Sequence, residues 1–179
     1  QYGDGIYKSI DGGRSWSNMG LENTHHIGKV IVHPNNSDII YVAAQGHYYT
    51  DNDERGVFKT LNGGKSWKKV LSIKHGKVHV GVTDLIMSPS DPDILYAASY
   101  ERIRRPWGFS GAGPKSGIYK SIDGGEKWTK LSNGLPDGLL GKIGLAIYPK
   151  DSNILYAIIE DANSPEMSYD ARWLEIQNC

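Results

Sequence analysis

The sequence has little of several features, and each shortage excludes a class of protein. Its 179 residues include a single cysteine, Cys179, which excludes an internal disulfide. The 20 Lys and Arg residues balance the 20 Asp and Glu residues, so the chain lacks the basic excess that duplex-binding proteins carry. No apolar run approaches the roughly 18 residues of a membrane helix. We therefore expect no nucleic-acid partner and no membrane span in this chain.

Metal-ligand spacing is also missing. A zinc site needs three or four converging ligands, often at fixed short spacings. The histidines lie at positions 25, 26, 33, 47, 75 and 79, and only the pairs His25–His26 and His75–His79 occupy equivalent loops. We expect these pairs to be solvated loop side chains, with no metal and no cofactor.

Glycine and aromatic residues are abundant, and many of them belong to a repeated motif. The chain holds 22 Gly, 11 Tyr and 5 Trp. The motif runs over residues 9–16, 60–67 and 121–128, and each copy follows a short strand-like segment of the form Gly-apolar-aromatic-Lys. The motif tryptophans are 51 and then 61 residues apart (67 − 16 and 128 − 67). A repeat of this length, in which each motif follows a strand-like segment, predicts a β-propeller.

A second repeated module lies between the motif copies. It consists of an apolar run, a proline, a turn and another apolar run in which a tyrosine follows the proline by seven residues. The three copies hold Pro34 and Tyr41, Pro89 and Tyr96, and Pro149 and Tyr156. Apolar residues occupy successive positions in these runs, which predicts strands buried on both faces. The combined order predicts an all-β fold, a partial β-propeller of four-stranded antiparallel blades.

This pattern also predicts how the chain is divided. Residues 1–161 would hold the end of one blade, two complete blades and the start of another. Residues 162–179 do not continue the repeat, and we interpret them as a truncated or aberrant tail. Fewer than four blades cannot close a ring, so the chain is expected to be a fragment with an open edge.

The repeated motif resembles the Asp-box, also called the bacterial neuraminidase repeat, which reads Ser/Thr-x-Asp-x-Gly-x-x-Trp. Two copies match fully, through Ser9, Asp11, Gly13 and Trp16 and through Ser121, Asp123, Gly125 and Trp128. The middle copy has Thr60, Asn62, Gly64 and Trp67, and so departs at Asn62. We expect all twelve residues to be structural, because the polar side chains accept backbone N–H bonds and glycine permits positive φ. Calcium ligation by Asp11 or Asp123 is the alternative, although the spaced oxygen ligands of an EF-hand are missing.

Candidate ligand-binding residues lie in the loops at the other end of the predicted strands, because rigid scaffolds usually carry function on such loops. The first loop supplies His47, Tyr48 and Tyr49, and the second supplies Arg102, Arg104, Arg105 and Trp107. Trp107 lies outside the repeat pattern. Its indole either stacks on a sugar ring or anchors a peptide, or it folds back to cap a neighbouring blade.

Four carboxylates are candidate catalytic groups, namely Asp53, Glu54, Asp84 and Glu101. Asp84 aligns with Lys29 and Gly144 at the start of the innermost strands. We expect Asp84 either to pair with Lys29 across the channel or to contact substrate.

As a whole, residues 1–161 resemble the Asp-box propellers grouped with sortilin-type domains and xyloglucanase-type glycoside hydrolases. The resemblance is carried by runs such as residues 3–9, 54–58, 104–107 and 110–117, which are typical of bacterial proteins labelled sortilin-like or glycosyl hydrolase. A photosystem II assembly factor propeller is more distantly similar. Proteins of this kind in bacteria are mostly exported, so the resemblance implies a periplasmic or secreted location.

The resemblance implies two functions. Sortilin-type relatives bind peptides, which predicts a binding or scaffold module for a polypeptide or glycan, with the remaining blades of the same propeller as a partner. Xyloglucanases of this fold are inverting hydrolases with two aspartates, which gives the alternative, a glycoside hydrolase whose site is shared with missing blades. No local stretch matches the xyloglucanase catalytic segments. Sialidase chemistry is disfavoured because the three arginines come from one loop rather than from separate blades.

Overall fold

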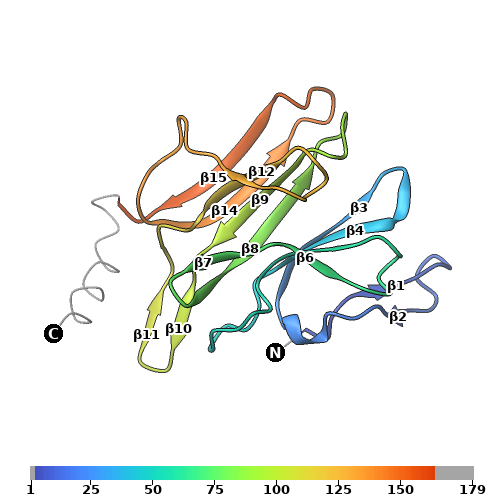
Figure 1. Cartoon of the computed structure of the whole chain (residues 1–179), viewed down its shortest axis with the longest axis horizontal. Coiled ribbons are helices and arrows are strands. Elements are labelled where there is room, and N and C mark those ends of the chain that lie inside the picture. Colours follow the sequence, from blue (N-terminus) through green and yellow to red (C-terminus); the bar gives the residue numbers. More distant parts are fainter. Residues whose placement is uncertain (1–2, 164–179) are drawn as a thin grey trace.

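The computed structural model describes residues 3–163, so most of the predicted tail lies outside the described residues. This part of the chain is almost entirely β-structure (Figure 1). A single-turn 3-10 helix, η1, spans Glu22–Thr24. The strands are β1 (Tyr7–Lys8), β2 (Ser17–Asn18), β3 (Ile27–His33), β4 (Asn36–Ala44), β5 (Gly56–Thr60), β6 (Lys68–Leu71), β7 (Ile73–His75), β8 (Val78–Met87), β9 (Leu95–Tyr100), β10 (Ile103–Arg105), β11 (Gly108–Ser110), β12 (Gly117–Ser121), β13 (Thr129–Lys130), β14 (Leu140–Ile147) and β15 (Leu155–Asp161).

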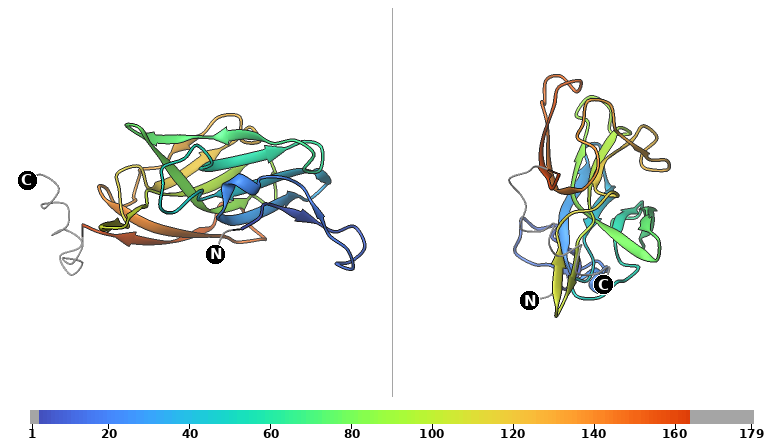
Figure 2. Two further views of the ribbon diagram at one scale, coloured as in Figure 1. Left: turned by 90° about the horizontal axis from the view of Figure 1, so that it is seen from below. Right: turned by 90° about the vertical axis from the view of Figure 1, so that its left-hand side faces the viewer.

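The strands form a succession of antiparallel sheets that follow the chain. One sheet has the order β3-β4-β5-β6, and the next has the order β7-β8-β9-β12-β13. The pairs β1-β2 and β14-β15 lie before and after these sheets in the sequence. The β10-β11 hairpin is inserted between β9 and β12 and protrudes from the body of the molecule (Figures 1 and 2). Sequence reasoning did not predict β7 or this hairpin.

Neighbouring sheets meet through the first long strand of each, which are β3, β8 and β14. A side chain on Gly28 of β3 would collide with the carbonyl of Thr83 on β8, so the close approach of these strands requires glycine. On the other side of β8, the amide of Leu145 on β14 donates to Asp84 at 2.8 Å. Twisted antiparallel sheets that adjoin through their first strands make up a β-propeller. The prediction of an all-β partial propeller with four-stranded blades is therefore confirmed, and β7 adds a short edge strand to one blade.

The main hydrophobic core lies between the two larger sheets. It includes Tyr41 and Val57 from the first sheet and Val82, Leu85 and Leu95 from the second. Burial on both faces, as predicted, is found for β8 and β9.

The same prediction is wrong for β3 and β15. Val32 on β3 is 52% exposed and Ile158 on β15 is 80% exposed. The reason is positional, because β8 and β9 have a sheet on each side, whereas within residues 3–163 one face of β3 and one face of β15 have no covering sheet.

Residues 9–16, 60–67 and 121–128, here called the motif turns, are each closed by the same two hydrogen bonds. In the first, Ser9 Oγ accepts from the amide of Gly13 at 2.8 Å and Asp11 Oδ1 accepts from the amide of Ser15 at 2.9 Å. Thr60 and Ser121 accept equivalently from Gly64 and Gly125 at 3.0 and 2.9 Å. Asn62 and Asp123 accept from Ser66 and Lys127, both at 2.9 Å. The polar motif positions therefore bond to the backbone of their own turn.

The motif tryptophans differ from one another. The indole N–H of Trp16 and that of Trp128 donate to Gly13 and Gly125 of their own turns at 3.1 and 2.9 Å. Trp67 instead donates to the carbonyl of Met19, in the preceding part of the chain, at 2.7 Å. The middle motif turn is therefore attached to the segment that follows β2.

The third motif turn is attached to the first large sheet. The carbonyl of Gly124 accepts from the Tyr41 hydroxyl and from Lys59 Nζ, both at 2.8 Å. Glu126 in the same turn lies 3.0 Å from Lys68 Nζ and 3.5 Å from Lys59 Nζ. These contacts fix the outer parts of two successive sheets to each other.

Candidate functional site

The connections that lie opposite the motif turns gather at one end of the molecule, here called the loop face. The amide of Gln45, just after β4, donates to His26 before β3 at 2.8 Å. Arg55, just before β5, donates to the carbonyl of His79 at 2.8 Å. Gly113, in the connection from β9 to β12, donates to Leu140 at 3.0 Å. The connections within the sheets therefore touch the connections between them, as the predicted strand order implies.

A stack of aromatic and cationic side chains occupies the loop face. The His26 and Tyr48 rings lie parallel with centroids 3.5 Å apart, and the Arg102 guanidinium carbon lies 4.0 Å from the Tyr48 centroid. Two groups this close to one ring cannot share a face, so Tyr48 is sandwiched between His26 and Arg102. The neighbouring rings of His25 and His47 are also stacked, at 3.7 Å. Three connections are thus joined through planar side chains, and each cation–π contact contributes about 0.5–2 kcal/mol.

The expectation that the paired histidines are solvated is wrong for His25, His26 and His79, which are half-buried, and holds for His75, which is exposed. His25 and His26 are half-buried in the stack, and burial, with smaller contributions from His47 and His26, lowers the pKa of His25. His75 Nδ1 lies 2.6 Å from the carboxylate of Glu101. His79 lies 3.2 Å from Asp53 and 3.5 Å from Asp51, at angles that do not make a hydrogen bond. Across residues 3–163, no three His, Cys, Asp or Glu side chains are grouped to hold a metal ion.

The predicted ligand-binding residues of the two loops come together. Arg104 lies 5.8 Å from the Tyr49 ring and 5.7 Å from the Phe109 ring. Arg105 donates to the Tyr49 carbonyl at 3.4 Å. Tyr49 and Phe109 are 54% and 40% exposed, so their rings are available on the surface.

Trp107 lies in the turn of the β10-β11 hairpin. Its side chain is 73% exposed, so it does not cap a blade within residues 3–163. The hairpin holds the indole beyond Arg104 and Arg105, which lie on β10. The extra tryptophan is therefore presented to solvent next to a cationic strand.

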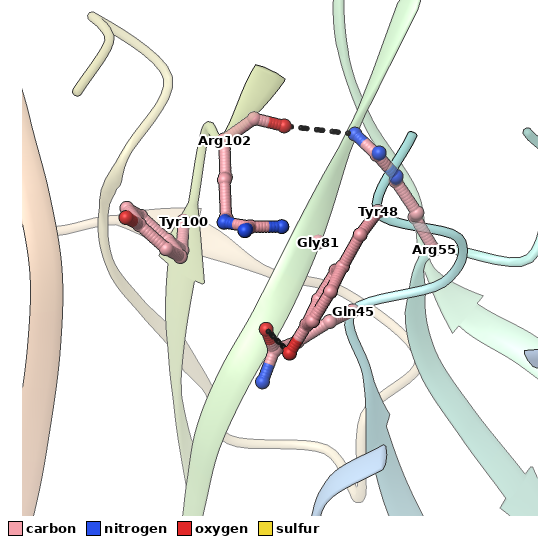
Figure 3. Close-up of a pocket in the computed structure, with 6 residues that line it drawn as sticks. All are labelled: Gln45, Tyr48, Arg55, Gly81, Tyr100 and Arg102. Atoms are coloured by element: carbon pink, nitrogen blue, oxygen red, sulfur yellow. Dashed lines mark hydrogen bonds between the residues drawn. The ribbon is translucent and has the colours of Figure 1, made fainter. Parts of the chain in front are cut away.

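Beneath the stack lies a narrow pocket of about 10 Å³. It is lined by Gln45, Tyr48, Arg55, Gly81, Tyr100 and Arg102 (Figure 3). Arg55 is only 5% exposed, and its two terminal nitrogens donate to the carbonyls of His79 and His47 at 2.8 and 2.7 Å. Burial lowers the pKa of Arg55, and the neighbouring Arg102 and Arg105 add to that effect. The sequence did not single out Arg55, because its place in a charged loop just before a strand gives no sign of burial.

Three of the four candidate catalytic carboxylates, Asp84, Asp53 and Glu101, make hydrogen bonds or ion pairs with other parts of the scaffold. Asp84 accepts from the amides of Leu85 and Leu145 at 2.9 and 2.8 Å. Among the described residues the expected ion pair of Asp84 with Lys29 is not formed, because both Asp84 oxygens are directed to β-strand amides instead.

The remaining candidates lie at the loop face. Asp53 is paired with Lys69 at 2.8 Å, and this hydrogen bond and charge lower its pKa. Glu101 is 5% exposed and accepts from the amide of Lys115 at 2.9 Å as well as contacting His75. Glu54 is half-buried next to Arg55 in the sequence. In the described chain no hydrogen bond joins any two of the four carboxyl groups.

The fold and this face define a class of protein: a β-propeller that presents an aromatic and cationic loop face. The chain belongs to the Sortilin-Vps10 family, described as "Sortilin, neurotensin receptor 3", whose model matches residues 4–169. No curated protein sequence matches the chain. Within residues 3–163 there is no helix with the length and apolar character needed to cross a membrane.

Solved structures support the fold. One is an ancestral GH74 enzyme, 22% identical with a TM-score of 0.61 over 86% of this chain and 19% of that chain. Another is a GH74 enzyme of Niastella koreensis, 18% identical with a TM-score of 0.58 over 84% of this chain and 21% of that chain. The chain therefore spans about a fifth of the length of these structures, and identities this low establish the fold alone.

Proposed function

We propose that this chain is part of a binding or scaffold module that holds a polypeptide or a glycan against its loop face. The observation that carries the proposal is the exposed Trp107 on the same hairpin as Arg104 and Phe109, where Arg104 also lies near the exposed Tyr49 ring. Exposed aromatic rings bury a large area at little conformational cost, and they stack on sugar rings or anchor peptide side chains. Cations beside them add charge recognition.

The carboxylates favour binding over hydrolysis within this chain. An inverting glycosidase needs one protonated and one ionised carboxyl about 6.5–9.5 Å apart. The pKa of Asp53 is lowered, which is the wrong direction for a general acid. Asp84 and Glu101 are held by backbone amides. Glycoside hydrolysis is the second candidate, because two structural relatives are GH74 enzymes, and it requires a site completed outside this chain.

A pair of exposed tryptophans provides the test. Trp107→Ala should weaken binding to a glycan or peptide at least about tenfold without a change in the unfolding midpoint, because a hot-spot aromatic carries about 2 kcal/mol or more. The matched control is Trp16→Ala, which removes a 61% exposed indole from a motif turn at the opposite end. Isothermal titration against panels of both ligand classes makes the measurement. Absence of binding to every ligand, or equal losses in the two variants, would overturn the proposal.

The same protein should be tested for reducing-end release from polysaccharides. Release that disappears in Glu54→Gln or Glu101→Gln, but not in the exposed control Glu22→Gln, would favour the hydrolase.

Export to the periplasm or the medium is part of our proposal and rests on the family resemblance. Cell fractionation followed by immunoblotting tests it, and recovery only in the cytoplasm would contradict it.

A further inference from the structure

Two arginines share the narrow pocket beneath the stack. Arg55 enters from the segment before β5, and Arg102 enters from the start of the insertion after β9 (Figure 3). Arg55 Nη1 also lies 3.4 Å from the Arg102 carbonyl, so the two residues are in direct contact. Two arginines from different connections therefore line the same narrow pocket.

Each arginine keeps a donor with no acceptor. Arg55 Nε and Arg102 Nη1 are buried and make no hydrogen bond within the described residues. The best-formed bonds of Arg55 go to the carbonyls of His79 and His47, which are neutral, and Arg102 lies over the Tyr48 ring. An unsatisfied buried donor on a charged group costs about 1–3 kcal/mol or more. Buried charges are normally paired, so this arrangement is unfavourable without a counterion.

The nearby acid Asp51 attracts Arg55 through its charge and so raises the pKa of Arg55 against the lowering by burial, but among the described residues it makes no hydrogen bond or ion pair with either arginine. Asp51 Oδ1 accepts from the amide of His79 at 3.0 Å, and Asp51 Oδ2 lies 3.5 Å from the His79 ring. Arg105 adds further positive charge near Arg55. A water molecule would accept the two N–H groups but would not compensate the charge.

The size of the pocket limits the ligand. Its volume of about 10 Å³ holds one water-sized group. Gly81 lines it, and a side chain at this position would collide with the backbone of Gln45, so the two backbones are closely packed at the wall of the pocket. The occupant must therefore be a compact anion or one atom of a larger anion.

We propose that Arg55 and Arg102 form a binding site for a compact monovalent anion. In it, Arg55 Nε and Arg102 Nη1 donate to a halide ion or to one oxygen of a carboxylate. Charge-assisted bonds of this kind are about twice as strong as neutral ones. Binding of a carboxylate oxygen rests on the proposed function, because the carboxylate would belong to a ligand bound on the loop face. Binding of a halide ion does not depend on that function.

Bromide and formate serve as probes with the full chain. Each anion should raise the unfolding midpoint in a saturable manner up to about 100 mM, because a ligand that binds only the folded state stabilises it. Arg102→Gln should weaken this binding at least about tenfold. The control Arg14→Gln removes the same charge from an exposed position in the first motif turn and should leave the binding unchanged. Competition between formate and bromide identifies a carboxylate site, and bromide binding without competition identifies a halide site.

Anomalous scattering from bromide-soaked crystals locates the bound ion directly, and it does not depend on whether a variant folds. A bromide peak between Arg55 Nε and Arg102 Nη1, together with saturable binding in solution, supports the site. A water in the pocket, binding at crystal concentration only, or equal anion effects in Arg102→Gln and Arg14→Gln would overturn it. A failure of the proposed function would look different, because Trp107→Ala would then leave ligand binding unchanged while bromide still binds.

Discussion

Single polar residues in the motif turns organise backbone amides. The pKa of Asp11 is lowered to about 2, first by the hydrogen bond from the Ser15 hydroxyl and then by the Ser15 amide. The pKa of Asp123 is also lowered, chiefly by the amide of Lys127. In the middle turn Asn62 accepts the same amide bond but donates to Ser66 Oγ at 2.8 Å, the reverse of the Ser15 to Asp11 bond. The substitution therefore keeps the turn geometry and removes the charge.

Asn62→Asp should raise the unfolding temperature at pH 7, because Ser66 would then donate twice to a carboxylate, as Ser15 does to Asp11. A carboxylate with a lowered pKa stabilises the fold above its unfolded pKa, so the gain should disappear as the pH falls from about 4 to about 2. Thermal melts across this range make the measurement. Asn133→Asp, at an exposed loop position, should show no such gain. A gain that persists at pH 2 would refute the carboxylate mechanism.

Asp84 shows how one residue joins two sheets. Asp84→Asn should destabilise the protein by about 1–3 kcal/mol, because the amide oxygen can serve only one of the Leu85 and Leu145 amides and the other loses its acceptor. Urea unfolding gives this value. Glu22→Gln, a change at an exposed side chain, is the control and should cost nothing measurable. Unchanged stability in Asp84→Asn would show that this inter-sheet bond is not formed.

At the scale of elements, successive sheets are held together at both ends of their strands. Near the first strands, Gly28 lies against Thr83 and Asp84 binds β14. Near the motif turns, Tyr41 on β4 and Lys59 on β5 both bind the carbonyl of Gly124. Burial, with smaller contributions from Asp93 and Glu126, raises the pKa of Tyr41 to about 12, so its hydroxyl stays protonated and able to donate.

Tyr41→Phe tests this contact between elements. It should cost about 0.5–1.5 kcal/mol, the usual net value of a lost hydrogen bond, while the ring continues to fill the core. Tyr156→Phe removes a hydroxyl from a 70% exposed side chain and should be neutral. The comparison requires only equilibrium unfolding curves. Equal effects in both variants would mean that the bond to Gly124 contributes nothing to the joining of the sheets.

At the scale of the whole molecule, histidines are concentrated at one end. Five of the six lie in or beside the loop-face connections, at positions 25, 26, 47, 75 and 79. His25 is packed against His47 and near His26, so protonation would place like charges in a half-buried stack. We therefore expect the loop face to be the part of the described structure that is most sensitive to a change in pH near neutrality.

A fall in stability below about pH 6.5 should follow from the lowered pKa of His25. The unfolded chain binds a proton at His25 at a higher pH than the folded chain does, so acidification favours unfolding. Denaturant midpoints at pH 7.5 and pH 5.5 measure the effect, and His25→Gln should reduce the difference. His33→Gln, on β3 away from the stack, should leave it unchanged. If His25→Gln leaves the pH dependence as large as before, His25 is not its source.

Features that depend on short spacing could be predicted from the sequence alone. The motif turns close through bonds between residues four positions apart, so their pattern is readable from eight residues. The period of the motif and the tyrosine spacing gave the strand order, and strand order alone places the connecting loops at one end. For that reason the sequence predicted the end of the molecule at which the loops with His47, Tyr48, Arg102 and Trp107 lie, whereas a role of these residues in binding stays a prediction.

The tertiary structure decided which loop residues meet. The sandwich of His26, Tyr48 and Arg102 joins residues 22 and 54 positions apart (48 − 26 and 102 − 48), and its geometry depends on the rotation between sheets. The burial of Arg55, the acceptors of Asp84 and the exposure of Trp107 have the same origin. None of these follows from local spacing, because each depends on how closely one sheet approaches the next.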